Sequence, residues 1–374
     1  AAAEVCPSGG VIRMRATPPQ TWFEAPSSHM RDVCVPASAG VAGVIGCSGV
    51  VKAWSGGAYD SVRRRMLVWG GGHEDYWGNE LYGFHLRTGT WSRVTEPSIP
   101  PDGTSGFFSQ DPLPDGQPVS RHSYDGVEFL ADRGVLWAQG GSRARDGGAT
   151  GLTWLFDGED TWSQRAPGPA GYSFAAAYDP ASAQVLVQTG EYLWSYDVAD
   201  DVWTALPGWG FPPLWPRYVF AGDKTAVVDP VRGLFWVVGG YGKRTPDGPD
   251  IGSHGNVLVW DIAAGQPVTE AWATTGGGAF SNKDWISNPD QHFESGGGDV
   301  FNVIGPGIDY DSAADDLVAW PNAGPPYALD LDTKQWTIGG AAGAPGYAGN
   351  SGGTLGRWRY IAAYNVFILV NSID

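Results

Sequence analysis

An internal repeat is the feature of this 374-residue chain that most constrains its fold. Each copy contains a small residue before Tyr-Asp or a similar pair, a turn, an apolar segment, a loop that often starts with Gly-Gly, an aromatic segment, a second turn and a tryptophan. Five copies occupy residues 56–91, 123–162, 176–203, 226–272 and 307–336. A sixth copy starts at residue 359 and contains only the first two segments of the unit. This recurrence predicts one structure built from similar units.

The segments within each copy have the character of β-strands. They are short apolar runs bounded by turn residues, in a chain with 56 Gly, 28 Pro and 19 Trp. No helical periodicity persists for more than a turn or two, and no apolar run is long enough to span a bilayer. We therefore expect an all-β, soluble protein that does not enter a membrane.

The repeat resembles the Kelch repeat of β-propellers, such as the propeller domain of galactose-oxidase-like proteins. The resemblance is carried by Gly71-Gly72, Gly140-Gly141 and Gly239-Gly240 after the second segment, and by "LYGFHLRTGTW", "LWSYDVADDVW" and "YALDLDTKQW" as third and fourth segments. It covers nearly the whole chain from Val51, although the third and fifth copies lack the Gly-Gly pair. It implies a six-bladed propeller of four-stranded blades.

The incomplete sixth copy needs strands from elsewhere. "TWFEAP" at residues 21–26 resembles an outermost strand with its tryptophan, Trp22. A strand from the N-terminus would complete the last blade beside Phe367, close the ring and remove a free sheet edge. We thus divide the chain into an N-terminal segment, 1–50, that supplies the closing strand, and a propeller, 51–374, which together form one domain.

The three cysteines, Cys6, Cys34 and Cys47, all precede the first repeat. Cys34 and Cys47 are close enough in sequence to form a small disulfide loop, in which case Cys6 has no partner cysteine within the chain. The Ala1-Ala2-Ala3 start resembles what remains after cleavage of a signal peptide. Together these features favour a secreted or periplasmic protein over a cytosolic one with three reduced thiols.

The charge of the chain limits its partners. The net charge is −17 and the sequence pI is near 4.6, whereas a nucleic-acid-binding surface is normally basic. We expect a polysaccharide or oligosaccharide as partner, no nucleic acid, and a monomer.

One face of the predicted propeller carries most of the titratable loop residues. Loops between the second and third strands, and between one blade and the next, emerge on the same face. Five of the six histidines fall in such connections, and only His85 lies within a strand. The histidines on this face are His29, His73, His122, His254 and His292. The arginines there are Arg121, Arg143, Arg145, Arg217, Arg244, Arg357 and Arg359.

These residue types suit a polysaccharide lyase that acts by β-elimination. Such an enzyme neutralises a uronate carboxylate, removes the neighbouring proton and protonates the leaving oxygen. We predict His73, His122 and Tyr218 as acid or base. We predict Arg121, Arg217 and Arg359 as the neutralising groups, and tryptophans could stack on sugar rings.

Two other functions compete with the lyase hypothesis. Several imidazoles around one cavity would suit a mononuclear metal enzyme holding copper, zinc, iron or calcium through His254 and His292, with His73 and His122. The chain departs from the copper-radical oxidases, because Tyr124 is an uncertain partner for a cross-link to Cys47 and no further domain follows to deliver a late histidine. The last alternative is a non-catalytic propeller that binds carbohydrate or protein.

The loop "GGGHEDYWGNELYGFHLRTGTW", residues 70–91, combines structural and unusual residues. Gly78 and Asn79 recur before another third strand, which predicts a turn, and Glu80 is expected to be solvated. His73, Asp75 and Tyr76 have no counterpart in most copies. We therefore predict a structural corner that carries a few functional side chains.

Overall fold

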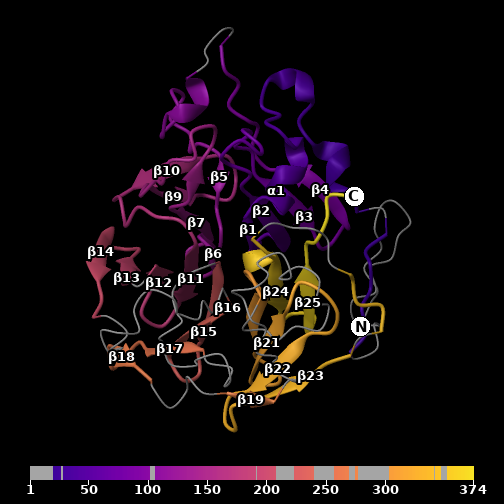
Figure 1. Cartoon of the computed structure of the whole chain (residues 1–374), viewed down its shortest axis with the longest axis vertical. Coiled ribbons are helices and arrows are strands. Elements are labelled where there is room, and N and C mark those ends of the chain that lie inside the picture. The colour runs from indigo at the N-terminus through magenta and orange to yellow at the C-terminus, as the bar shows by residue number, and fades with distance from the viewer. Residues whose placement is uncertain are drawn as a thin grey trace, which may run out of the picture.

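A computed structural model describes residues 20–26, 28–101, 106–190, 192–207, 223–239, 257–268, 274–276, 303–340, 342–346 and 352–374. Within these residues the chain forms an all-β propeller with five four-stranded antiparallel blades, whose sheets follow one another around a common centre (Figure 1). The prediction of an all-β propeller with four-stranded blades is therefore confirmed. No helix among these residues is long and apolar enough to cross a membrane.

The first three blades are complete meanders. Blade one contains β1 (Gly56–Asp60), β2 (Arg65–Trp69), β3 (Tyr82–His85) and β4 (Thr90–Arg93). Blade two contains β6 (Val127–Leu130), β7 (Val135–Gln139), β9 (Thr153–Phe156) and β10 (Trp162–Arg165). Blade three contains β11 (Phe174–Asp179), β12 (Gln184–Thr189), β13 (Tyr192–Asp197) and β14 (Val202–Ala205). A separate small ribbon joins β5 (Arg121–His122) to β8 (Ser142–Arg143).

Blades four and five follow the same order. Blade four contains β15 (Lys224–Asp229), β16 (Leu234–Gly239), β17 (Leu258–Asp261) and β18 (Gln266–Pro267). Blade five contains β20 (Gly307–Asp311), β21 (Asp316–Trp320), β22 (Tyr327–Asp330) and β23 (Gln335–Ile338), with β19 (Thr275–Gly276) added parallel to β23. The last sheet has two strands, β24 (Trp358–Ile361) and β25 (Val366–Leu369), and β24 lies beside both β20 and β1.

The predicted sixth four-stranded blade is wrong, and so is its completion by an N-terminal strand beside Phe367. Residues 20–26 form no strand, and the Trp22 amide donates to Ala342 O at 3.2 Å, beyond β23. The Trp22 ring instead packs between Trp320 and Trp358, at centroid distances of 5.9 and 5.7 Å. Packing of this ring between blade five and the last sheet leaves the tryptophan half-buried without any strand pairing.

The repeated residues of the sequence build the blades. The tryptophans of the second strands are fully buried, as large aromatic side chains in a propeller core are expected to be: Trp69, Trp137, Trp236 and Trp320. The recurring aspartate at the end of an inner strand makes the following turn. Asp229 Oδ1, for example, accepts hydrogen bonds from the amides of Val231 and Arg232 at 2.9 and 3.1 Å.

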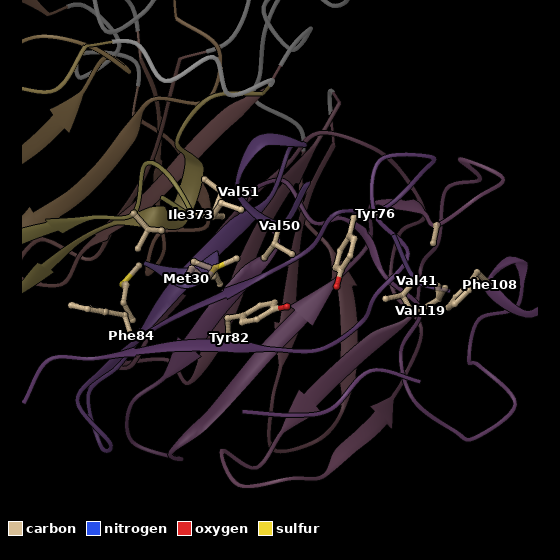
Figure 2. Close-up of a cluster of buried hydrophobic side chains, with 14 of the residues drawn as sticks. Met30, Val41, Val50, Val51, Tyr76, Tyr82, Phe84, Phe108, Val119 and Ile373 are labelled. Atoms are coloured by element: carbon tan, nitrogen blue, oxygen red, sulfur yellow. The ribbon is translucent and has the colours of Figure 1, made fainter. Parts of the chain in front are cut away.

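The segment before β1 covers the outer part of blade one. It contains the short helix α1 (Gly49–Lys52) and the 3-10 helices η2 (Met30–Val33), η3 (Ala37–Ala39) and η4 (Gly46–Ser48), while η5 (Phe107–Ser109) and η9 (Leu355–Arg357) lie farther along the chain. Met30, Val41 and Val50 pack into one buried cluster with Tyr82 of β3 and with Ile373 near the C-terminus (Figure 2). The predicted Cys34–Cys47 disulfide is present in this segment and is confirmed.

Candidate functional site

The loops of blades one and two meet at His73. Its amide donates to Arg143 O at 3.0 Å, and its own carbonyl accepts a hydrogen bond from the Arg145 amide. The Trp77 indole N–H also donates to this carbonyl, at 3.1 Å. Three hydrogen bonds thus fix the backbone of His73 while its side chain is exposed.

The backbone of His73 is in an uncommon conformation. Its φ is +40°, in the left-handed region that favours glycine. A Cβ atom added to the neighbouring Gly147, itself at φ +67°, would lie only 2.7 Å from His73 Cδ2, so this glycine leaves room for the imidazole ring. Strained residues that their surroundings hold in place concentrate at functional sites. We therefore take His73 as the centre of the candidate site.

A second histidine stands beside the first. The His122 ring lies edge-on to the His73 ring, with centroids 5.9 Å apart and an interplanar angle of 88°. His122 is buried, and its Nε2 lies 2.8 Å from Asp75 Oδ2. Because a carboxylate only accepts hydrogen bonds, we assign the proton to Nε2, which leaves the lone pair on Nδ1. Asp75 thereby fixes both the tautomer and the orientation of the His122 ring.

Trp54 connects this histidine pair to blades three and four. Its ring is 5.0 Å from that of His122, and its indole N–H donates to Asp223 Oδ2 at 2.7 Å. The other carboxylate oxygen of Asp223 accepts a hydrogen bond from the Ser173 hydroxyl at 2.6 Å. Burial raises the pKa of Asp223, although the hydrogen bonds from Ser173 and Trp54 act in the opposite direction.

The residues that lead into the inner strands share the uncommon backbone of His73. Trp54, Tyr124 and Ser173 precede β1, β6 and β11, and their φ angles are +44°, +47° and +56°. The Tyr124 ring also stands edge-on to His122, at a centroid distance of 6.2 Å. We name the set His73, Asp75, His122, Trp54, Tyr124, Ser173 and Asp223 the His73 cluster. Its geometry suits proton transfer, because two imidazoles and two carboxyl groups occupy one connected network.

Cationic and aromatic residues are hydrogen-bonded to the backbone of His73 or of its neighbouring loop. Arg143 is half-buried and forms an ion pair with Asp146 at 2.8 Å, while the exposed Arg145 lies over the Trp77 ring at 5.5 Å. Tyr172 is 48% exposed, and its hydroxyl donates to Gly147 O at 3.1 Å. These groups could meet an anionic sugar next to the imidazole.

Arg121 and Arg359, both predicted as neutralising groups, have buried ion-pair partners outside the cluster. Arg121 donates to both carboxylate oxygens of Asp111 at 3.1 Å, beneath the Trp69 ring. Arg359 Nη2 donates to Glu128 Oε1 at 2.5 Å. Burial raises the pKa of Glu128 to about 7 even though Arg359 lowers it. Arg357, which was expected on the same face but not as a neutralising group, is fully buried and donates to three backbone carbonyls.

The structure does not describe all of the predicted residues. Arg217, Tyr218, Arg244, His254 and His292 are outside the described residues. The structure therefore brings together two of the predicted histidines, His73 and His122. His85 is in β3, where its Nε2 lies 2.9 Å from Ser92 Oγ and burial lowers its pKa.

Three residues of the loop 70–91 differ from expectation. Glu80 is completely buried rather than solvated, and it accepts hydrogen bonds from the hydroxyls of Tyr76 and Tyr82, the latter at 2.6 Å. The two hydroxyl groups point toward one another (Figure 2). Asn79 is more than a turn former, because its side chain amide joins Ser98 and Pro118 O. Tyr76 is therefore a structural residue.

Sequence reasoning missed Trp54, Ser173, Asp223 and Tyr172. A signal for the first two was present, since each stands one or two positions before an inner strand, and Tyr124 stands three positions before another. Asp223 and Tyr172 had no such signal, because their partners are distant in sequence or are backbone atoms.

The described part of the chain contains no group of three or more His, Cys, Asp and Glu side chains that could hold a metal ion. Comparison of the sequence with models of known protein families found none that matches, and no curated protein matches it either.

Proposed function

We propose that this protein is a secreted carbohydrate-active enzyme, a polysaccharide lyase whose reaction centre is His73. The observation that carries the proposal is the environment of His73. Its exposed imidazole is attached to a strained backbone that is held by hydrogen bonds, and it stands edge-on to His122, whose ring is oriented by the Asp75 carboxylate. Backbone strain and oriented titratable groups concentrate at residues that bind a ligand or transfer protons, and an ordinary loop residue does not require them.

The reaction is a β-elimination at a uronate. His73 takes the proton from C5, the C4–O4 bond breaks as the C4=C5 double bond forms, and the resulting imidazolium returns the proton to O4. His122 is a positioning residue, since it is buried behind His73 and is held by Asp75. Tyr218 remains a second candidate for the acid.

The substrate carboxylate must be neutralised for its neighbouring proton to become acidic. Arg121 and Arg359 are buried in other ion pairs, so we assign this role to Arg143 and Arg145, the residues hydrogen-bonded to the His73 backbone. Arginine suits the task because its planar guanidinium can bind a carboxylate through two hydrogen bonds. Arg217 remains a third candidate.

Tyr172 provides a stacking surface for a neighbouring sugar. Its ring is 48% exposed, and the hydrogen bond from its hydroxyl to Gly147 O ties it to the loop that flanks His73. Aromatic rings of this kind combine an apolar face with a polar end. Secretion is supported by the Cys34–Cys47 disulfide, because such bonds persist mainly in oxidising compartments.

A screen of acidic polysaccharides tests the proposal. The purified protein is incubated with polymers rich in uronates, and the ultraviolet absorbance of the unsaturated uronate product is followed. We expect an increase with at least one polymer and none with neutral polysaccharides. Binding of a polymer without any cleavage would contradict the lyase and favour the non-catalytic propeller.

A further inference from the structure

The disulfide-bonded segment lies directly against the loop that carries Asp75. The Val44 amide donates to Glu74 O at 2.8 Å, and the Ile45 amide donates to Asp75 O at 3.1 Å. In the reverse direction, the Trp77 amide donates to Val41 O at 3.0 Å. Three backbone hydrogen bonds therefore join residues 41–45 to the three residues 74, 75 and 77.

The contact is tight at Gly43. This glycine has φ +56°, and a Cβ atom added to it would lie 2.5 Å from Asp75 O. The segment has no strand of its own, and the Cys34–Cys47 bond closes it across 13 residues of sequence. The position of residues 41–45 therefore depends on this covalent link and on the packing of Val41 in the cluster of Figure 2.

The Asp75 side chain connects residues 41–45 to the two histidines of the His73 cluster. Its Oδ2 contacts His122 at 2.8 Å, and the His122 ring in turn stands edge-on to His73. A displacement of the Asp75 backbone would break the hydrogen bond, because such bonds weaken steeply with distance and angle.

We propose that the Cys34–Cys47 disulfide is a positioning element for Asp75, and that its reduction disconnects Asp75 from His122. A dithiol reductant would carry out the step: its two thiols reduce the disulfide to two cysteine thiols and form a disulfide themselves. Both cysteines are only half-buried, which gives a small dithiol access. The effect on catalysis rests on the proposed function, whereas the effect on the Asp75–His122 bond does not.

Nuclear magnetic resonance of the intact protein with labelled histidine tests the bond. In the oxidised protein we expect a downfield, slowly exchanging Nε2 proton of His122, which Asp75→Asn would shift. After reduction by a dithiol, or in the Cys34→Ser/Cys47→Ser variant, we expect this signal to be lost while the rest of the spectrum remains that of a folded protein. An unchanged His122 signal in the reduced, folded protein would overturn the proposal.

Two further variants keep the test decisive if the reduced protein unfolds. Gly43→Ala retains the disulfide but places a methyl group against Asp75 O, so it should also remove the His122 signal; a retained signal would overturn the proposal. Val187→Ala, in the core of blade three, is the control for general destabilisation and should leave the signal in place. Loss of the signal in this control as well would count against a specific path through the disulfide. If a lyase substrate is found, reduction should lower kcat about 100-fold, the size of effect expected for a misplaced group.

Discussion

The Asp75 carboxylate lies 2.8 Å from the His122 ring nitrogen, and this contact joins a loop of blade one to the strand that leads into blade two. Because this contact joins the two blades, the geometry of the His73 cluster depends on how blades one and two pack together.

Replacing Asp75 by Asn should reduce catalysis without unfolding the protein. The amide keeps the shape of the carboxylate but not its charge, so the tautomer of His122 is no longer fixed. We expect kcat to fall roughly 100-fold with little change in Tm, because the Asp75 side chain is 28% exposed. The control is Asp132→Asn, a surface carboxylate that accepts a bond from Tyr178. An unchanged kcat would remove Asp75 from the mechanism.

Gly147→Ala should displace the His73 ring. The added methyl group would lie 2.7 Å from His73 Cδ2 on a backbone with φ +67°, where non-glycine residues are strained. We expect a loss of stability of about 1 kcal/mol and a much larger relative loss of activity. Gly116→Ala has a similar φ, +85°, and open space around the new atom, so it should cost stability without loss of activity. Equal activity in the two variants would contradict the role of His73.

Stability should fall as the pH rises from about 5 to about 8. Burial raises the pKa of Glu128 to about 7 from its usual 4.5, so the folded protein binds more protons than the unfolded chain in this window. The stabilisation is complete below the unfolded pKa and is lost as the pH rises through 7, on the order of 3 kcal/mol at most. The pKa values of Asp125 and Asp309 are also raised by burial, which acts in the same direction.

The pH effect can be measured by denaturant unfolding across this range. Glu128→Gln should flatten the profile, whereas Glu159→Gln, on the exposed surface, should leave it unchanged. A stability that increases steadily from pH 5 to 8 would be incompatible with buried carboxyl groups whose pKa values are raised in the folded protein.

Arg357 should be essential for closing the ring between the last sheet and blade one. Its guanidinium donates to Ser55 O at 2.9 Å, Val370 O at 2.5 Å and Gly353 O at 2.6 Å. Arg357→Leu would leave three buried carbonyls without these donors, and we expect a loss on the order of 3 kcal/mol or more. Arg133→Leu, at the surface, should change stability little. A loss no larger than that of the control would show that the closure does not depend on Arg357.

The sequence predicted the features that depend on local patterns. The strands and turns of each blade follow from the repeated tryptophans and aspartates, and the disulfide joins cysteines only 13 positions apart. The predicted closure by an N-terminal strand was wrong because the half-buried Trp22 packs its ring against two other tryptophans without pairing as a strand. The same repeat unit does not reveal whether its last copy is completed by other strands.

Individual site residues were harder to predict because their partners are remote. The ion pair of Arg359 with Glu128 spans 231 positions, and the hydrogen bond of Trp54 with Asp223 spans 169. Glu80 illustrates the same limit over a short distance, since its burial depends on two tyrosine hydroxyls that could equally have faced water. A list of loop residues therefore contains both structural and functional members until the fold separates them.

The most direct test of the central claim is the product formed by the wild-type protein, by His73→Ala and by His85→Ala from one uronate polymer. We predict a C4=C5 double bond at the new chain end, seen by nuclear magnetic resonance, with the wild type and with His85→Ala. Its rate of formation should fall by a factor of about 100 or more in His73→Ala while Tm is retained. New chain ends without the double bond, or an unimpaired His73→Ala variant, would contradict the account.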